Sequence, residues 1–224
     1  MTGAAAPDRR DQDFDVPTLV RMSRRWWLSA RPTASHLDGP PGGGIISRRM
    51  ARSRKLHIGG QVRTEGWEVL DANPRPTVDH LGDARDLKQF EEGAFDALYA
   101  SHVLEHFDYK DELPATLREW RRVLAPGGTL FVSVPDMRVL ASLFVLKDEL
   151  TVQERYDVMR MIFGGHVDRY DYHLIGFDID FLTIFLTEAG FQNPRRVPTF
   201  GLFEDTSAMS FKGVPISLNM ICQK

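Results

Sequence analysis

The chain has 224 residues, of which 42% are hydrophobic, and a formal net charge of −3. This length can bury one substantial core, so we expect one domain with an irregular end rather than two full domains. No apolar run approaches the roughly 20 residues of a membrane-spanning helix, and no secretory signal pattern is present. We therefore expect a cytoplasmic protein without an integral membrane segment. The single cysteine, Cys222, excludes an internal disulfide and a cysteine-rich zinc cluster.

Charge is distributed unevenly along the chain. Residues 1–55 hold eleven Lys and Arg against five Asp and Glu, whereas the remainder holds 17 against 26. The basic stretch is interrupted by Pro and Gly, which predicts a loosely ordered arm over residues 1–53. Such an arm could touch nucleic acid or anionic lipid, or it could rest against its own domain. The acidic remainder argues against a large nucleic-acid footprint, so we expect no nucleic-acid partner.

From Lys55 onward, short apolar runs alternate with helical segments, a pattern typical of an α/β fold with a mostly parallel sheet. Residues 136–175 fit no strand of the sheet and predict an inserted helical cap. In such sheets, ligands bind outside the carboxyl ends of the strands. The predicted strands cover residues 55–58, 68–70, 94–100, 129–134 and 214–223, and the predicted helices cover residues 115–124 and 178–189.

Three successive strand ends carry residues that suit a nucleoside ligand. Gly59 and Gly60 follow the first strand, where the absence of side chains lets the backbone approach a ligand closely. Asp71 follows the second, and a carboxylate there can accept both hydroxyls of a ribose. Further on, the Asp83 carboxylate and the backbone at Ala84 could contact an adenine edge. Each feature alone is equally an ordinary turn, but their order along the chain favours a bound nucleoside.

Two longer motifs carry a resemblance to a known family, FDALYASHVLEH at residues 95–106 and WRRVLAPGGTL at residues 120–130. With them, residues 55–136 resemble the class I S-adenosylmethionine-dependent methyltransferases, especially their type 11 branch. The last third, including YDYH at residues 170–173, also resembles a bacterial subgroup often associated with glycan and polysaccharide pathways. The resemblance implies a Rossmann-like, doubly wound, seven-stranded sheet over residues 54–224, with S-adenosylmethionine as cofactor.

The resemblance also implies which residues contact the cofactor. The first loop departs from the family pattern, because His57 and Gln61 flank only two glycines, where the family has an acidic residue and a third glycine. Only about a dozen residues separate this loop from the end of the second strand, so the linking helix must be very short. The implied contacts are Gly59 and Gly60 under the methionine, Asp71 at the ribose, Asp83 and Ala84 at the adenine, and Ser101 and His102 at the methionine end.

Histidines supply the candidate catalytic groups. A neutral His106 imidazole near pH 7 can take a proton from an acceptor hydroxyl, although a core or capping histidine is the alternative. Asp171 and His173 lie in an aromatic stretch and can form a carboxylate-oriented base. His102 to His106 also spells H-x-x-E-H, a zinc-peptidase motif that would need a long helix and a further acidic ligand. Here the motif directly follows a strand, so we predict no metal site. Some methyltransferases of this broad class resemble the motif further, because an E-x-x-E-H cluster holds a divalent metal against the acceptor. His102 replaces the first Glu of that cluster here, so the sequence leaves metal dependence open.

The sequence thus predicts an S-adenosylmethionine-dependent methyltransferase that modifies a small-molecule or glycan acceptor, by O-methylation. One alternative is a non-catalytic module with this fold and a degraded cofactor site, and a more remote one is the zinc peptidase. A nucleotide-dependent oxidoreductase would need the G-x-G-x-x-G fingerprint, which the first loop lacks. The sequence leaves the oligomeric state open.

Overall fold

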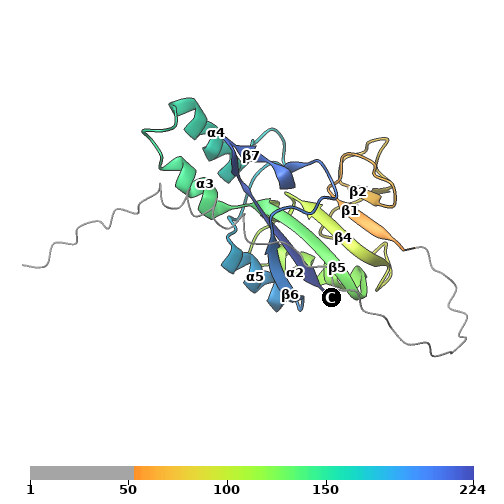
Figure 1. Cartoon of the computed structure of the whole chain (residues 1–224). Coiled ribbons are helices and arrows are strands. Elements are labelled where there is room, and N and C mark those ends of the chain that lie inside the picture. The colour runs from red at the N-terminus through yellow and green to blue at the C-terminus, as the bar shows by residue number, and fades with distance from the viewer. Residues whose placement is uncertain (1–52) are drawn as a thin grey trace, which may run out of the picture. The chain divides into compact units, whose positions relative to one another are not determined.

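The computed structural model describes residues 53–224, so the predicted arm at residues 1–53 lies outside them apart from Ser53 (Figure 1). Within the described residues, no helix has the length and apolar character needed to cross a membrane. The elements in chain order are β1 (Lys55–Ile58), β2 (Glu68–Asp71), β3 (His80–Leu81), β4 (Phe95–Ser101), η1 (Leu104–His106), α2 (Glu112–Val123), β5 (Leu124–Pro135), α3 (Met137–Phe144), α4 (Val152–Phe163), α5 (Ile179–Glu188), β6 (Gln192–Val197), η2 (Thr206–Ala208), β7 (Ser210–Phe211), β8 (Val214–Pro215) and β9 (Ser217–Gln223).

Seven strands form one sheet in the order β3-β2-β1-β4-β5-β9-β6. Strands β1 to β5 pair in parallel, whereas β9 runs antiparallel to both of its neighbours, β5 and β6. This mixed, mostly parallel sheet confirms the predicted Rossmann-like α/β fold. The strand predicted at residues 214–223 is divided, because β8 pairs with β7 in a separate two-stranded sheet and only β9 joins the large one.

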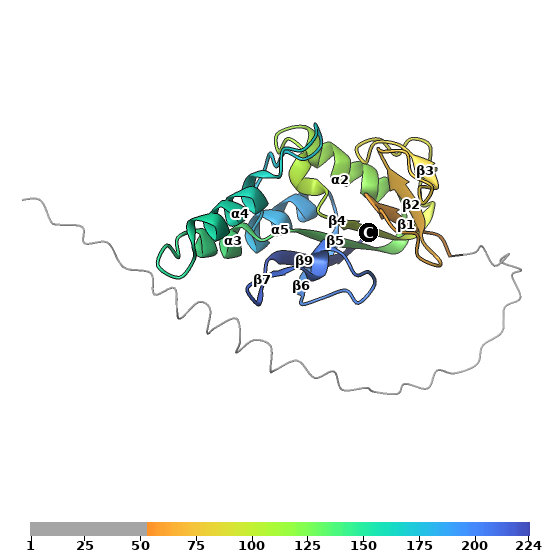
Figure 2. The ribbon, with the colours of Figure 1, turned by 90° about the horizontal axis from the view of Figure 1, so that it is seen from above.

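The two faces of the sheet are covered differently. Along β4, Leu98 and Ala100 belong to the main core, which also contains the buried residues of α2 and α5. Ala97 and Tyr99 point to the other face, where aromatic residues from the segment 198–209 pack on them. Figure 2 shows α2 and α5 on one side of the sheet and the blue C-terminal segments on the other. As the spacing predicted, the link from β1 to β2 is short, and it contains turns but no helix.

The boundary between α2 and β5 differs from the prediction. The helix ends at Val123, and β5 begins at Leu124, where the sequence predicted a helix end followed by a turn. Leu124 is fully buried and pairs with Phe95 of β4, so it belongs to the strand and not to the helix. The Ala125–Gly128 segment then forms an irregular start of the strand, with a register shift between Phe95 and Ala97.

Two helices, α3 and α4, form within the segment predicted as a helical cap. Asp136 begins α3 by accepting a hydrogen bond from the Val139 amide, and its carboxylate also pairs with Arg196 at 3.0 Å. Thr151 and Glu154 form a capping box at the start of α4. A small core separate from that of the sheet joins these helices to the C-terminal segment. The extent of the cap, residues 136–175, stays a prediction. The buried members of this core are Leu140, Leu143, Leu150, Val158 and Ile216.

His57 of β1 makes stability depend on pH. Its ring lies on the aromatic face, with centroids 4.3 Å from Phe203 and 4.9 Å from Tyr99. Burial lowers its pKa to about 4, against the charges of Asp205 and Asp71, which raise the pKa. The folded state therefore favours the neutral ring. The stability that depends on this neutrality is present above the ordinary pKa near 6.5 and is lost as the pH falls from there towards 4.

Replacing His57 by Phe removes this titration and keeps an aromatic ring in the cluster. We expect the free energy of unfolding of the variant to fall less between pH 7 and pH 4 than that of the parent, by at most about 3 kcal/mol. Denaturant titrations of both chains at each pH measure the difference. Equal pH dependence of the two chains would show that the pKa of His57 is the same in the folded and the unfolded state.

Candidate active site

The carboxyl ends of β1, β2 and β4 place three predicted site residues in one row. Ile58 of β1 pairs with Leu70 of β2 and with Ala100 of β4. The residues that follow are Gly59, Asp71 and Ser101, which therefore lie side by side at the same edge of the sheet. The Gly59 amide donates a hydrogen bond to the Leu70 carbonyl at 2.8 Å, which fixes the turn after β1 against β2.

Asp71 is buried, and its carboxylate has local partners. Its Oδ1 accepts a hydrogen bond from the Asn73 amide at 2.6 Å, and its Oδ2 lies 3.1 Å from a guanidinium nitrogen of Arg75. A carboxylate has about four acceptor positions, so these two contacts leave capacity for a ligand hydroxyl. The structure therefore has the carboxylate at the edge that the resemblance implied, held in place by its own loop.

The predicted adenine contacts are already engaged within the protein. The Asp83 carboxylate accepts hydrogen bonds from the Arg85 amide and from the Arg85 guanidinium, and this pairing lowers the pKa of the carboxyl. The Ala84 carbonyl accepts a hydrogen bond from the indole N–H of Trp120 at 2.8 Å. Both residues follow β3 at the same edge of the sheet, since Leu81 pairs with Asp71.

Helix η2, far along the chain, lies against the end of β4. The hydroxyls of Ser101 and Thr206 are 2.8 Å apart, and Tyr99 donates to the Asp205 carboxylate at 2.8 Å. Ser207 also contacts the Tyr99 hydroxyl, at 3.0 Å. The sequence analysis missed these residues, because more than 100 positions separate them from β4 and no motif marks them. Only the order of strands in the sheet, with β9 next to β5, brings them here.

The H-x-x-E-H segment does not form the α-helix that a zinc peptidase requires. His102 has a positive φ of 55°, and the short 3-10 helix η1 begins only at Leu104. His102 and His106 are therefore not one α-helical turn apart on a common face. His102 instead bonds through Nε2 to the Ser217 hydroxyl at 2.9 Å. Burial, with the nearby His173, lowers the pKa of His102 to about 4.

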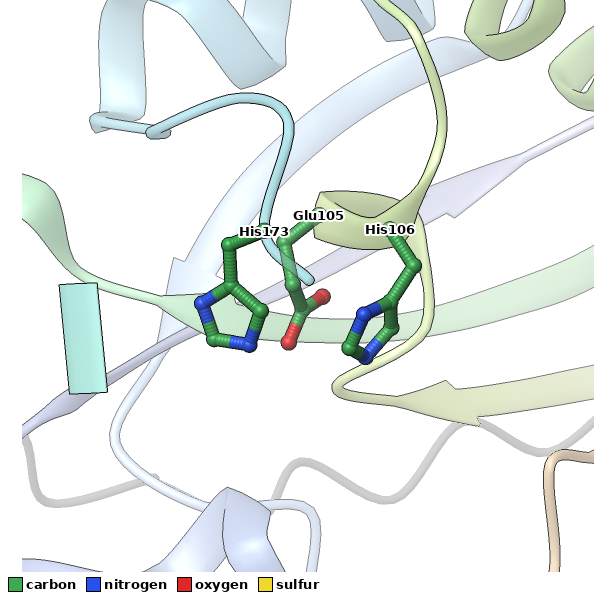
Figure 3. Close-up of side chains that lie close together, drawn as sticks. All are labelled: Glu105, His106 and His173. Carbon is green, nitrogen blue, oxygen red and sulfur yellow. The ribbon is translucent and has the colours of Figure 1, made fainter. Parts of the chain in front are cut away.

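Glu105, His106 and His173 lie together next to this turn (Figure 3). The rings of His106 and His173 have centroids 4.9 Å apart, although 66 positions separate the two residues. Burial raises the pKa of the Glu105 carboxyl to about 8, and burial together with His106 lowers the pKa of His173 to about 4. Neutral imidazoles with available nitrogen lone pairs can accept protons or bind cations.

Asp171 lies near this group without hydrogen bonding to His173. Its carboxylate accepts from the Val167 amide at 3.2 Å, while Nδ1 of His173 lies 3.2 Å from the Ile162 carbonyl. The structure therefore brings two of the predicted catalytic residues together, His106 and His173. It orients His173 by a backbone carbonyl rather than by the predicted carboxylate.

Comparisons with known proteins show what the chain is similar to. Residues 37–132 match the family model described as a methyltransferase domain. A curated relative, the probable tRNA methyltransferase 9B of Mus musculus, is 26% identical over 156 residues, which is 67% of this chain. The chain spans about a third of the length of that relative, since the match covers 34% of it.

A solved structure shares the fold. The S-adenosylmethionine-dependent methyltransferase from Archaeoglobus fulgidus superposes with a TM-score of 0.51 and 15% identity, over 77% of this chain and 86% of the other. The family match includes the row of strand ends and the H-x-x-E-H segment. The chain is therefore similar to the methyltransferase-domain family over residues 37–132, and it shares its fold with the solved methyltransferase structure.

Proposed function

We propose that the chain transfers the methyl group of S-adenosylmethionine to a hydroxyl oxygen of a small molecule or a sugar. The proposal rests on the contact between Gly59, at the carboxyl end of β1, and the segment that leads to His106. Gly59 packs so closely on Val103 that a Cβ added to Gly59 would lie 2.8 Å from the Val103 Cγ2 atom. Val103 immediately precedes η1, which contains His106. A methyl donor bound at Gly59 and a methyl acceptor bound at His106 and His173 would therefore be neighbours.

The residues at the edge fit the cofactor. Gly59 adopts a positive φ of 74°, which turns the chain sharply after β1 and leaves no side chain over the edge. Asp71 has acceptor capacity for ribose hydroxyls. Ser101 ends β4 and His102 follows it, where the resemblance implies the methionine end of the cofactor. We propose that these residues, with Gly60, Asp83 and Ala84, hold S-adenosylmethionine.

When bound, the cofactor supplies a methyl group on a positively charged sulfur, which needs no further activation. The protein then has to align the acceptor oxygen with the methyl group and exclude water. Either His106 or His173 can take the proton that the hydroxyl loses as the new O–C bond forms and the S–C bond breaks. Asp171 contributes charge beside His173.

A small acceptor or a sugar suits the surface around the histidines. Phe163 accepts a hydrogen bond from the His173 amide, and Tyr172 directly precedes His173. Tyr170 lies three residues before His173, and all three aromatic side chains are exposed. Aromatic side chains typically line sites for small ligands. The resemblance of this stretch to a subgroup associated with glycan pathways also supports a sugar. One relative is named a probable tRNA methyltransferase, but the acidic composition of this chain after residue 55 disfavours an extensive phosphate contact.

A direct test uses the full chain, methyl-labelled S-adenosylmethionine and a panel of hydroxyl acceptors that includes free sugars and oligosaccharides. We expect label in one acceptor class, on oxygen, as identified by mass spectrometry, with one S-adenosylhomocysteine formed per methyl group. Calorimetry with S-adenosylmethionine and S-adenosylhomocysteine addresses the alternative of a non-catalytic module. Absence of binding by either compound would favour that alternative, and label on nitrogen or on RNA would contradict the proposed acceptor.

Replacement of Gly59 tests the glycine turn. Gly59→Ala places a Cβ against Val103 at a positive φ, so we expect S-adenosylhomocysteine to bind about tenfold more weakly or worse. Gly66→Ala is the matched control, because Gly66 also has a positive φ, of 79°, but a Cβ there meets nothing within 4 Å. Calorimetry on both variants, with thermal unfolding to verify the fold, makes the comparison. Equal losses of affinity would mean that backbone strain in the loop, rather than the approach to Val103, causes the effect.

Replacement of Asp71 tests the ribose contact. We expect Asp71→Ala to weaken S-adenosylmethionine binding at least tenfold, about 1.4 kcal/mol, because a charge-assisted bidentate contact is lost. Arg75→Ala serves as the comparison, since it removes the partner of Asp71 and keeps the carboxylate. Its affinity should stay within about threefold of the parent. An unchanged affinity in Asp71→Ala would exclude the ribose role.

A further inference from the structure

Glu105, His106 and His173 offer three ligand atoms that all lie within 4.8 Å of one another. Figure 3 shows the Glu105 carboxylate between the two imidazole rings, with His173 arriving from a different segment of the chain. Ligand atoms around a tetrahedral zinc ion lie about 3.3 Å apart. A small inward movement of the side chains would bring the three atoms to that spacing.

Both histidines are oriented by the backbone through the same ring nitrogen. Nδ1 of His106 lies 3.1 Å from the Tyr172 carbonyl, and Nδ1 of His173 lies 3.2 Å from the Ile162 carbonyl. A carbonyl only accepts, so each Nδ1 carries the proton and donates, which leaves each Nε2 as an unprotonated lone pair. Histidines that bind metals almost always donate their other ring N–H in this way.

Glu105 supplies an independent observation. Its side chain is fully buried, yet neither carboxylate oxygen has a hydrogen-bond partner within residues 53–224, the part of the chain that the structure describes. His102 Nδ1 lies 3.5 Å from Oε1, which is too long for a strong hydrogen bond. Buried carboxylates are ordinarily hydrogen bonded, paired with a cation or bound to a metal. The carboxylate that points into the histidine pair therefore lacks the partner that its burial requires.

The backbone is built to bring His173 to this place. The Leu174 amide donates to the Glu105 carbonyl at 2.7 Å, and the His173 amide donates to the Phe163 carbonyl at 3.0 Å. Gly164 permits the close approach, because a Cβ there would lie 2.3 Å from the Asp171 carbonyl oxygen. The segment that contains His173 is thus fixed both to η1 and to the end of α4. The three candidate metal ligands, which lie on two segments of the chain, are therefore positioned before any ion binds.

We propose that Glu105, His106 and His173 bind one divalent transition-metal ion. Two imidazoles and one carboxylate suit zinc, iron(II), cobalt(II) or nickel better than magnesium or calcium, which prefer oxygen ligands. Three protein ligands leave at least one coordination position for a substrate oxygen or water. The sequence analysis predicted no metal site and left metal dependence open. It considered ligands only within residues 102–106, and no motif pointed to a further ligand near position 173.

The proposal deepens the proposed function, on which only its catalytic consequence rests. A cation at these residues would lower the pKa of an acceptor hydroxyl beside it. His106 and His173 would then act as ligands rather than as direct bases. The hydroxyl proton would leave to solvent water when the acceptor binds the cation, before water is excluded and the methyl group is transferred. Metal binding itself requires neither S-adenosylmethionine nor an acceptor, so it can be tested separately.

The test uses the untagged full chain, stripped of metal by a chelator and dialysed against zinc or cobalt(II). We expect one equivalent of zinc per chain, visible absorption from bound cobalt(II) that zinc displaces, and a higher Tm with metal. Glu105→Gln, which keeps the shape of the buried side chain, and His173→Ala should each weaken zinc binding about tenfold or more. His166→Ala is the matched control, since His166 lies on the same segment, stacked on Tyr172, outside the three ligands.

Two results would overturn the proposal. One is the absence of stoichiometric zinc and cobalt binding by the parent chain, and the other is an equal loss of binding in His166→Ala and His173→Ala. S-adenosylhomocysteine binding, measured on the same variants, separates this proposal from the proposed function. If zinc binds and S-adenosylhomocysteine does not, the metal site stands and the methyltransferase activity fails. If S-adenosylhomocysteine binds and zinc does not, the metal site is wrong and the proposed function still stands.

Discussion

The chain leaves β4 through a left-handed turn at His102, and the whole candidate site depends on that turn. A positive φ at a residue with a side chain costs about 1 kcal/mol or more. The amide of His102 offsets this cost by donating to the Ser133 carbonyl at 2.9 Å, and its ring bonds to Ser217. The turn directs the chain into η1 instead of a long helix. As a result Val103 packs on Gly59, and Glu105 and His106 face the segment that contains His173.

The face of the sheet that contains His57 and Tyr99 is not covered by a helix between β1 and β2. Because residues 59–67 link β1 to β2 without a helix, the face that contains His57 and Tyr99 is covered by the segment 198–209 instead. The same segment continues into η2, whose Thr206 bonds to Ser101. The aromatic cluster therefore both closes the core on this face and holds η2 at the end of β4. The packing around Tyr99 is therefore linked to Ser101 at the carboxyl end of β4.

The sequence predicted β1, β2, β4 and most of β9, because each is a short apolar run that ends at a polar or glycine residue. It did not predict the edge strands β3 and β6, because β3 has only two residues and β6 has no apolar run. It placed Gly59, Asp71 and Ser101 at strand ends, and parallel pairing alone brings such ends together. It misplaced the start of β5, since the pairing of Leu124 with Phe95 is a tertiary contact that local patterns do not encode. It could not find η2, or the Glu105 environment, for the same reason. The burial of Glu105 depends on a segment 66 or more residues away, which returns through Gly164 and is fixed by the Leu174 amide.

Without a bound ion, the fully buried Glu105 carboxylate has no hydrogen-bond partner among the described residues. Its carboxyl must stay protonated to be tolerated at full burial, yet the protonated form still needs an acceptor for its hydrogen. An unsatisfied buried polar group costs about 1–3 kcal/mol, and replacement by Leu or Met of similar volume would remove that cost. The two histidines do not compensate a carboxylate, because burial and their proximity favour the neutral form of His173. A bound cation would favour the ionised Glu105 carboxylate and give its oxygens a partner. It would also use the unprotonated ring nitrogens of His106 and His173, which the backbone orients.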